Sequence, residues 1–215
     1  MGVGSSGDCS ISRVGASDPA VFRLPQEISD DVVQLRRWVR DDAQRLGQAV
    51  TESLEHLRPW MPWVVSEPLS VSERRELIAG WERDWTQRGD VLLGVFTAGE
   101  IVGSCGLHRR IAPDGLEIGY WIHPAYLRRG LATRTAALLT SLGLSAPGIT
   151  HIEIHHDKAN VASAGVARKL GFAFLTEEVD VPEASGEVGV EWRWRMEAQA
   201  WQARLDEAAR ARPAA

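Results

Sequence analysis

The stretch from Gly115 to Thr133 constrains the fold most, because a strand pattern passes there directly into a helix pattern. Residues 116–123 alternate with the period of two that is typical of a β-strand. One face carries Leu116, Ile118, Tyr120 and Ile122, and the other carries Glu117, Gly119, Trp121 and His123. Arg128-Arg129-Gly130 then precedes apolar residues at helical spacing. The chain therefore leaves a strand through a short turn and enters a helix near Gly130.

The rest of the periodicity predicts the other elements. Strands are expected at 32–38, 91–96, 101–108, 151–155, 172–180 and 187–196, and helices at 43–57, 70–88, 160–170 and from about 198. The strands at 91–96, 101–108 and 116–123 have short links, which favour antiparallel pairing. The next strand is reached through a helix, which favours a parallel crossover. We predict an α/β (α+β) fold with a mixed, mostly antiparallel central sheet flanked by helices.

Local signals mark helix starts and turns. Asp41 and Asp42 stand where N-capping acids belong, and Ser70 with Glu73 forms a capping-box pattern. The helix after Ser70 is expected to bury one stripe, which consists of Leu77, Ile78, Trp81 and Trp85. Ala98-Gly99-Glu100 and Ser185-Gly186 predict the turns of two hairpins.

The composition is that of one ordinary globular domain. The 215 residues are 44% hydrophobic and 25% charged, and the net charge of -5 gives the whole chain no basic footprint for nucleic acid. No apolar run is long enough to cross a membrane. Cys9 and Cys105 are not expected to pair, which favours a reducing cytoplasm. Residues 1–20 are predicted to be a flexible lead-in, and residues 21–215 a single domain ending in a helix.

The turn before Gly130 has the features of an anion site. A helix begins there, so unpaired backbone N–H groups and the positive end of the helix dipole point at the turn. Gly130 and Ala132 keep side-chain bulk away from the backbone. Arg128, Arg129 and Arg134 add positive charge. The same pattern also fits a plain strand–turn–helix with solvated arginines.

A second informative stretch runs from Asp157 to Phe172. Asn160 is expected to cap the helix, and its amide can also bind an amide-bearing ligand. Ser163 lies one helical turn further on the same face. Leu170 is expected in the core, and Gly171 is expected to end the helix.

Together the two stretches resemble motifs A and B of the GCN5-related N-acetyltransferase (GNAT) superfamily. The phosphate-loop pattern of that family, Gln/Arg-x-x-Gly-x-Gly/Ala, corresponds here to Leu127-Arg-Arg-Gly130-Leu-Ala132. The strand Glu117-Ile-Gly-Tyr-Trp-Ile-His-Pro124 and the Asn-x-x-Ser helix ending in Lys169-Leu-Gly-Phe172 are most similar to the RimJ/RimL-like branch. That branch acetylates protein N-terminal amines and, in some members, small amines. The resemblance covers residues 32–196.

The resemblance implies acetyl-CoA as acyl donor and no metal. Its pantetheine arm would lie where the strands 116–123 and 151–155, the fourth and fifth in chain order, splay apart. The cofactor-binding residues implied by the resemblance are Trp121, Ile122 and His123 for the arm, Arg128, Arg129, Gly130, Leu131, Ala132 and Thr133 for the diphosphate, and Asn160 and Ser163 from the following helix.

The chemistry requires a base for the amine, a donor for the developing oxyanion and a group near the leaving thiolate. We expect Glu117 to be the base, because partial burial beside the cleft would raise its pKa; a structural carboxylate is the alternative. The oxyanion donor is expected from the backbone of Trp121–His123. Ser163 is expected near the thiolate, since Ala167 occupies the position of the tyrosine that is the acid in many family members. Leu127 likewise removes one polar diphosphate contact.

Trp60 and Trp63 flank Met61-Pro62 and are candidates for an aromatic wall of the acceptor site, with a hydrophobic plug as the alternative. His108 is a further substrate-binding candidate, and both His108 and His123 are alternative bases. His155, His156 and Asp157 lack metal-ligand spacing.

The predicted function is acetyl transfer to a primary amine by direct attack in a ternary complex. The acceptor is a protein or peptide N-terminal α-amine or a small amine. The alternative function is a non-catalytic acyl-CoA sensor. A homodimer is compatible with the family, and no nucleic-acid or membrane partner is expected.

Overall fold

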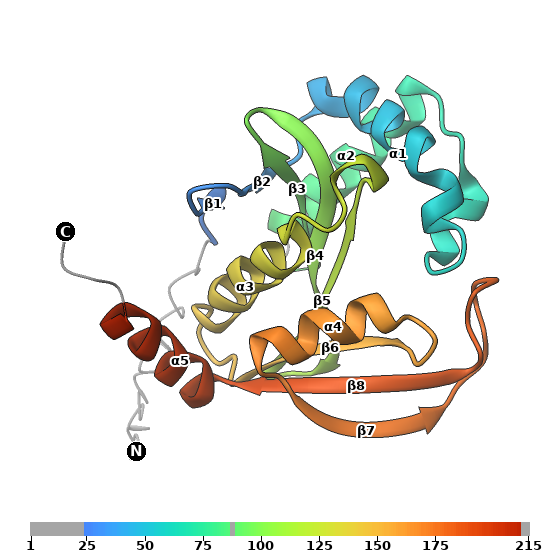
Figure 1. The fold of residues 1–215 in the computed structure, drawn as a ribbon. Coiled ribbons are helices and arrows are strands. Elements are labelled where there is room, and N and C mark those ends of the chain that lie inside the picture. The colour runs from blue at the N-terminus through green and yellow to red at the C-terminus, as the bar shows by residue number, and fades with distance from the viewer. Residues whose placement is uncertain (1–23, 87–88, 212–215) are drawn as a thin grey trace, which may run out of the picture.

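The computed structural model describes residues 24–86 and 89–211 of the chain (Figure 1). Its strands are β1 Glu27–Ser29, β2 Gln34–Arg37, β3 Val91–Thr97, β4 Glu100–Ala112, β5 Gly115–Ile122, β6 His151–Asp157, β7 Ala173–Val179 and β8 Val190–Glu197. Its α-helices are α1 Ala43–Leu57, α2 Val71–Thr86, α3 Leu131–Leu144, α4 Val161–Leu170 and α5 Ala198–Ala211. Short 3₁₀ helices are η1 Arg40–Asp42, η2 Pro62–Ser66 and η3 Pro124–Tyr126.

One sheet joins the described strands in the order β1-β2-β3-β4-β5-β6-β8-β7. All neighbouring pairs are antiparallel except β5 and β6, which are parallel because α3 connects them. The mixed, mostly antiparallel sheet flanked by helices is confirmed. β5 and β6 pair only over Gly115–Glu117 and His151–Glu153. The two strands therefore part beyond these residues, as predicted for the fourth and fifth strands of the sequence scheme.

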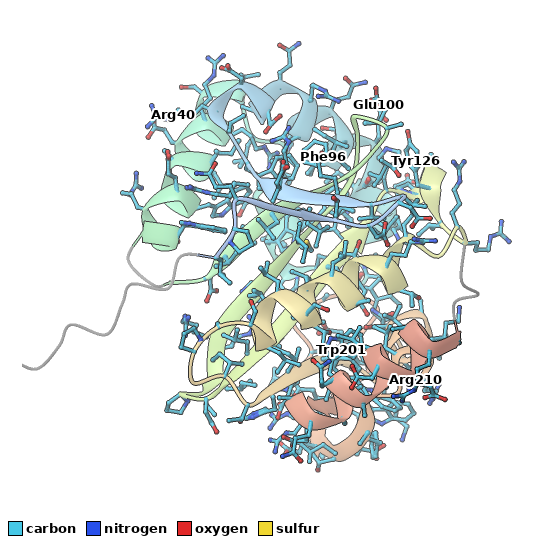
Figure 2. All side chains as sticks on the ribbon, turned by 90° about the vertical axis from the view of Figure 1, so that its left-hand side faces the viewer. Arg40, Phe96, Glu100, Tyr126, Trp201 and Arg210 are labelled. Atoms are coloured by element: carbon cyan, nitrogen blue, oxygen red, sulfur yellow. The ribbon has the colours of Figure 1, made fainter. Side chains whose placement is uncertain are left out.

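Helices cover both faces of the sheet, which splits the core in two. α3, α4 and α5 lie on one face, where Leu139, Ala164 and Trp201 belong to the larger core cluster (Figure 1). α1 and α2 lie on the other face and pack Leu46 and Ile78 against the sheet. In Figure 2, Trp201 of α5 points toward α3, where its Nε1–H donates to Ser141 Oγ over 3.0 Å. Leu116, Ile118 and Ile122 belong to the larger core cluster, whereas Trp121 belongs to the smaller one on the other face of the sheet. The alternation predicted for residues 116–123 is therefore confirmed.

The N-terminal part differs from the sequence prediction. The expected strand 32–38 is shorter, and β1, which was not predicted, pairs with it. β1 has three residues, too few for a period to be visible, and the turn after it forms because Asp30 accepts the N–H groups of Val32 and Val33. Asp42 is the N-cap residue of α1, but its side chain binds Arg36 and the Val39 N–H instead of the helix. It therefore fixes the entry from β2.

Most other local signals are confirmed. Ser70 and Glu73 form the capping box, with Ser70 N donating to Glu73 Oε2 over 2.8 Å and Glu73 N to Ser70 Oγ over 3.2 Å. Ala98 and Gly99 take positive φ in the β3–β4 turn. Leu77 is the exception on α2, since it is 37% exposed while Ile78 is buried; the stripe follows Ile78, Trp81 and Trp85 and passes beside Leu77.

The predicted lead-in, residues 1–20, lies outside the described residues. In the part of the chain that is described, no helix is long and apolar enough to cross a membrane.

Candidate active site

The parting of β5 and β6 opens the sheet at one place. Beyond Glu117 and Glu153, the edge of β5 that faces β6 pairs with no strand in the part of the chain that the structure describes. A backbone edge without a partner must bind water or a ligand. The gap is therefore a place where an extended amide chain can add to β5, as predicted for Trp121, Ile122 and His123.

The turn before α3 has the backbone of an anion site. Arg128 and Gly130 both take positive φ, 60° and 77°, and Gly130 is the N-cap residue of α3. Consecutive N–H groups in such a turn form a concave nest for an anion. Leu131, Ala132 and Thr133 form the first turn of α3, whose N–H groups have no helical partner. A Cβ on Gly130 would meet no atom within 4 Å, so glycine is needed there for its φ and not for space.

The arginines of this turn are not equivalent. Arg128 and Arg129 are exposed, and Arg129 rests on the Tyr126 ring with its Nη2 donating to Ala125 O over 3.1 Å. Arg134 instead binds Asp30 and Asp31 at 2.8 and 2.6 Å, which ties α3 to the turn before β2. Those aspartates hold the pKa of Arg134 above its usual range. Arg128 and Arg129 are thus the residues with positive charge free for a phosphate.

The start of α4 faces the gap from the α3 side of the sheet. Asn160 caps α4 by accepting the Ser163 N–H over 3.2 Å, which confirms the predicted cap and leaves its amide nitrogen for another acceptor. Ser163 Oγ is 3.2 Å from the Tyr120 hydroxyl of β5. Burial raises the pKa of Tyr120 to about 12, and the Ser163 contact opposes that shift. The phenol therefore keeps its proton, and the two hydroxyls bridge β5 and α4.

His123 is buried where β5 ends, and both its ring nitrogens are engaged. Nδ1 accepts the Ala125 N–H over 3.2 Å, so Nε2 carries the proton and donates to Glu52 on α1 over 3.1 Å. Hydrogen bonds from Gln48 and from His123 lower the pKa of Glu52. His123 therefore positions the turn after β5 and has no nitrogen lone pair left to act as a base.

Glu117, the predicted base, is buried and held in an ion pair. Arg110 of β4 donates from Nε and Nη2 to the two carboxylate oxygens, over 2.7 and 2.5 Å. The carboxylate also lies 3.7 Å from His155 Nδ1. Two-point binding by a guanidinium is strong and fixes the orientation of the carboxylate, and here it occupies both oxygens of Glu117. No sequence pattern indicates that Arg110 reaches Glu117, because the two residues lie on different strands.

A cavity of 530 Å³ opens on the face of the sheet opposite α3 and α4. Its size is in the usual range for small-ligand sites. The charged lining consists of Glu117, Glu153, Glu178, Asp180, Glu183 and Glu191 with Arg110, Arg193 and Arg195. These six carboxylates exceed the three guanidinium groups, so the cavity favours a cationic ligand. No sequence pattern indicates this cavity, since its residues come from five separate strands and a loop.

A second cavity of 270 Å³ lies between the α1–α2 connection and the β7–β8 loop. Met61 and Pro62 line it, whereas their neighbours Trp60 and Trp63 do not. Trp60 is half-buried and Trp63 is 39% exposed. The two loops meet where Gly186 N donates to Pro59 O over 2.9 Å. An acceptor wall of Trp60 and Trp63 stays a prediction, and the residues of this connection that line the cavity are Met61 and Pro62 with their neighbours.

Comparisons with known proteins agree with this geometry. The family model "Acetyltransferase (GNAT) domain" matches residues 33–173. The chain belongs to the GNAT family of acetyltransferases. The Bacillus subtilis protein YdaF, provisionally named a ribosomal N-acetyltransferase, is 23% identical over 141 residues, which are 65% of this chain and 77% of that protein.

Two solved structures of the RimJ/RimL type share the fold. RimL, the ribosomal L7/L12 α-N-protein acetyltransferase in complex with coenzyme A, gives a TM-score of 0.73 at 19% identity and covers 82% of this chain and 98% of its own. Mycobacterium smegmatis RimJ in complex with CoA-disulfide gives 0.72 at 22% identity and covers 83% and 90%. This GNAT is thus an acetyl-CoA-dependent acyltransferase of RimJ/RimL-like fold.

The residues present fit a CoA-type donor. The positive-φ turn at Arg128 and Gly130 and the start of α3 suit a diphosphate, and the open edge of β5 with the Asn160 amide suits a chain of amides. These places surround the gap on the face that carries α3 and α4. The acidic cavity lies on the opposite face of the same gap.

Proposed function

We propose that this GNAT transfers acetyl from acetyl-CoA to a primary amine by direct attack in a ternary complex. The preferred acceptor is a protein or peptide N-terminal α-amine, and a small amine is the second candidate. The observation that carries the proposal is the gap between β5 and β6, which has an anion-binding turn on one face and an acidic cavity on the other. Donor and acceptor can therefore bind together and meet through the sheet.

The acidic cavity supports an amine acceptor. An α-amine arrives largely as a cation at neutral pH, since its pKa is about 7.7–8.0. The excess of carboxylates in the lining attracts such a cation. The β7–β8 loop and the α1–α2 connection meet beside it, and an extended peptide could leave the cavity along the second cavity, which shares Glu183 with the first.

The thioester supplies an activated acyl group. Of the two protons that the ammonium loses, one goes to solvent through a base and one ends on the leaving sulfur. Ser163 is the group proposed near that sulfur, and Tyr120 can donate to Ser163 Oγ while Ser163 donates onward. Glu117 and His108 both lie on the acceptor face and are the candidates for the base. The oxyanion donor is proposed to be a backbone N–H of Trp121–His123.

Two measurements test the proposal. Thermal unfolding with acetyl-CoA, CoA, NAD and ATP should show stabilisation by the CoA species alone; a ligand at 100 times its Kd adds about 2.7 kcal/mol. Mass spectrometry should then show acetylation of a peptide with a free N-terminus and no lysine. A matched peptide with a blocked N-terminus and one lysine should react far less. Equal reaction of both peptides would refute the α-amine preference, and no shift with CoA would refute the donor site.

We also propose a cytoplasmic location, as the predicted free cysteines and the ribosomal names of the relatives suggest. A homodimer stays a prediction, which light scattering of the purified protein can check.

A further inference from the structure

A bare patch of sheet lies next to the gap, on the acceptor face. Gly106 of β4 and Gly119 of β5 are direct partners in the antiparallel ladder. Gly119 follows Glu117 on β5, where β5 no longer pairs with β6. The backbone edge of Gly119 that does not pair with β4 therefore faces the gap. The imidazole of His108 lies over the two glycines: a Cβ at Gly106 would come within 3.1 Å of Nε2, and one at Gly119 within 3.3 Å. A side chain at either position would crowd the ring, and the two glycines let it lie close to the sheet.

Asp90, just before β3, fixes the orientation of that ring. Its Oδ2 lies 2.7 Å from His108 Nδ1, and its Oδ1 accepts the Arg109 backbone N–H over 2.9 Å. Burial raises the pKa of Asp90, but these two donors outweigh burial and lower it overall. An ionised carboxylate can only accept, so Nδ1 carries the proton. The lone pair of neutral His108 is therefore on Nε2, above Gly119.

Resting on the proposed function, we propose that His108 is the base that takes the proton from the acceptor amine, and that Asp90 is its positioning residue. Nε2 makes no hydrogen bond with the described residues and stands beside the strand edge where the acyl group is expected. A carboxylate that holds one imidazole N–H and leaves the other nitrogen basic is the arrangement used by serine hydrolases.

The proton balance is complete with this assignment. The ammonium loses one proton to become a neutral nucleophile, its nitrogen forms the C–N bond as the C–S bond breaks, and the second nitrogen proton is also released. Nε2 takes one proton and returns it to water, because the His108 side chain is 18% exposed. The other proton ends on the leaving sulfur, near Ser163.

The other candidates on this face are less suited to the task. Glu117, the register partner of His108, is bound at both oxygens by Arg110. His155 donates to Glu153 over 2.5 Å, and its Nδ1 faces Glu117 and Glu191 at 3.7 and 3.6 Å. Both ring nitrogens of His155 therefore already face carboxylates of this chain.

The charged groups that face His108 are few. They are Asp90 before β3, Glu117 on β5 and Arg110, which lies on β4 and neutralises Glu117. Among the described residues, no ion pair joins His108 to a group on α1 or α2.

The sharpest variant is Asp90→Asn. The Arg109 N–H can only donate, so the amide oxygen of the new side chain should turn to it and its NH₂ group to His108 Nδ1. Nδ1 must then accept, and the proton moves to Nε2. The lone pair above Gly119 is lost although the imidazole stays. The ¹⁵N shifts of His108 in the protein without ligands should show the Nδ1–H tautomer in the wild type and the Nε2–H tautomer in Asp90→Asn.

Activity gives the second readout. We expect His108→Gln and Asp90→Asn to lower kcat/KM by about 10²- to 10⁴-fold and to remove its acidic limb. Stabilisation by acetyl-CoA should be unchanged, because the donor site is on the other face. His56→Gln, which replaces an exposed histidine of α1, is the matched control and should keep full activity.

Different results overturn different proposals. If Glu117→Gln loses the acidic limb of the pH profile of kcat/KM and His108→Gln keeps it, the base is Glu117, and the assignment of His108 with Asp90 is refuted. An Nε2–H tautomer in the wild type would also refute it, whatever the activity. A wild-type protein that binds acetyl-CoA and acetylates no amine would refute the proposed function, and the base with it.

Discussion

The contact between the β7–β8 loop and the α1–α2 connection offers a direct test of how the acceptor site is built. Gly186 N donates to Pro59 O, and a Cβ on Gly186 would lie 2.6 Å from Pro59 Cβ and 2.7 Å from Pro59 O. Gly186 has no left-handed φ, so alanine causes no backbone strain. Because the neighbouring atoms include backbone, Gly186→Ala must push the two segments apart.

The expected size follows from the lost hydrogen bond. A backbone hydrogen bond is worth about 0.5–1.5 kcal/mol net, which corresponds to roughly a 2- to 13-fold change in an equilibrium constant. If the closed loop forms part of the acceptor site, KM for a peptide acceptor should rise by that factor. The kcat value at saturating peptide and the Kd of acetyl-CoA should not change. A loss of about 1 kcal/mol would also lower Tm by about 2–4 °C.

The assay is steady-state acetylation of the free-N-terminus peptide at saturating acetyl-CoA. Gly47→Ala on α1 is the matched control, because a Cβ there meets no atom within 4 Å. Removing a helical glycine should stabilise the protein by about 0.5–1 kcal/mol and leave KM unchanged. A Gly186→Ala enzyme with wild-type KM for the peptide, and a lowered Tm showing that the contact is broken, would refute a role of this loop in acceptor binding.

Three further predictions concern other parts of the molecule. Asn160→Ala should lose about 0.5–2 kcal/mol of stability, because it removes the cap of α4. Asn160→Asp keeps the capping oxygen and should weaken only the binding of CoA. Calorimetry with CoA separates the two effects, and an unchanged CoA affinity of Asn160→Asp would exclude a contact between CoA and the Asn160 amide. Arg74→Met should lower the free energy of unfolding, measured in urea, by about 3–5 kcal/mol, because it leaves the Glu67 carboxylate buried without the guanidinium at 2.6 Å. Adding Glu67→Leu to the same chain should recover much of that loss. Burial, with Arg168 nearby, lowers the pKa of His156. Below a pH of about 6.5 the unfolded chain therefore binds more protons at His156 than the folded chain does, and stability should fall. His156→Gln should lose less Tm than the wild type between pH 7.5 and 5.5, and an equal loss would contradict this origin.

The sequence predicted the elements whose signals are local. The alternation at residues 116–123 predicted a β-strand, and β5 lies there. Both core clusters contain residues from β5, so the structure buries it on both faces. The Ser70–Glu73 box and the Asn160 cap follow from groups within a few residues of each other. The start of a helix near Gly130 was predicted as well, whereas the positive φ of Gly130 was found only in the structure. The anion turn and the start of α4 were therefore predictable together with the resemblance that they carry.

Glu117 and His108 were predicted one by one for the acceptor side, but the contacts between its residues were not predictable, because strand register alone brings them together. Nothing near Glu117 in sequence indicates that Arg110 binds both its oxygens, or that His108 is its ladder partner. Tyr120 was assigned to a core face, and only the approach of α4 brings its hydroxyl to Ser163.

What the sequence determined by itself was the local chemistry: where strands and helices run, where the backbone can bind an anion, and which family the chain resembles. What only the tertiary structure decided was which side chains meet across β3, β4, β5, β6 and β8. The physical reason is that a pairing register is set by the whole sheet. A shift of one residue in β4 against β5 would move His108 off the paired glycines and turn it to the other face.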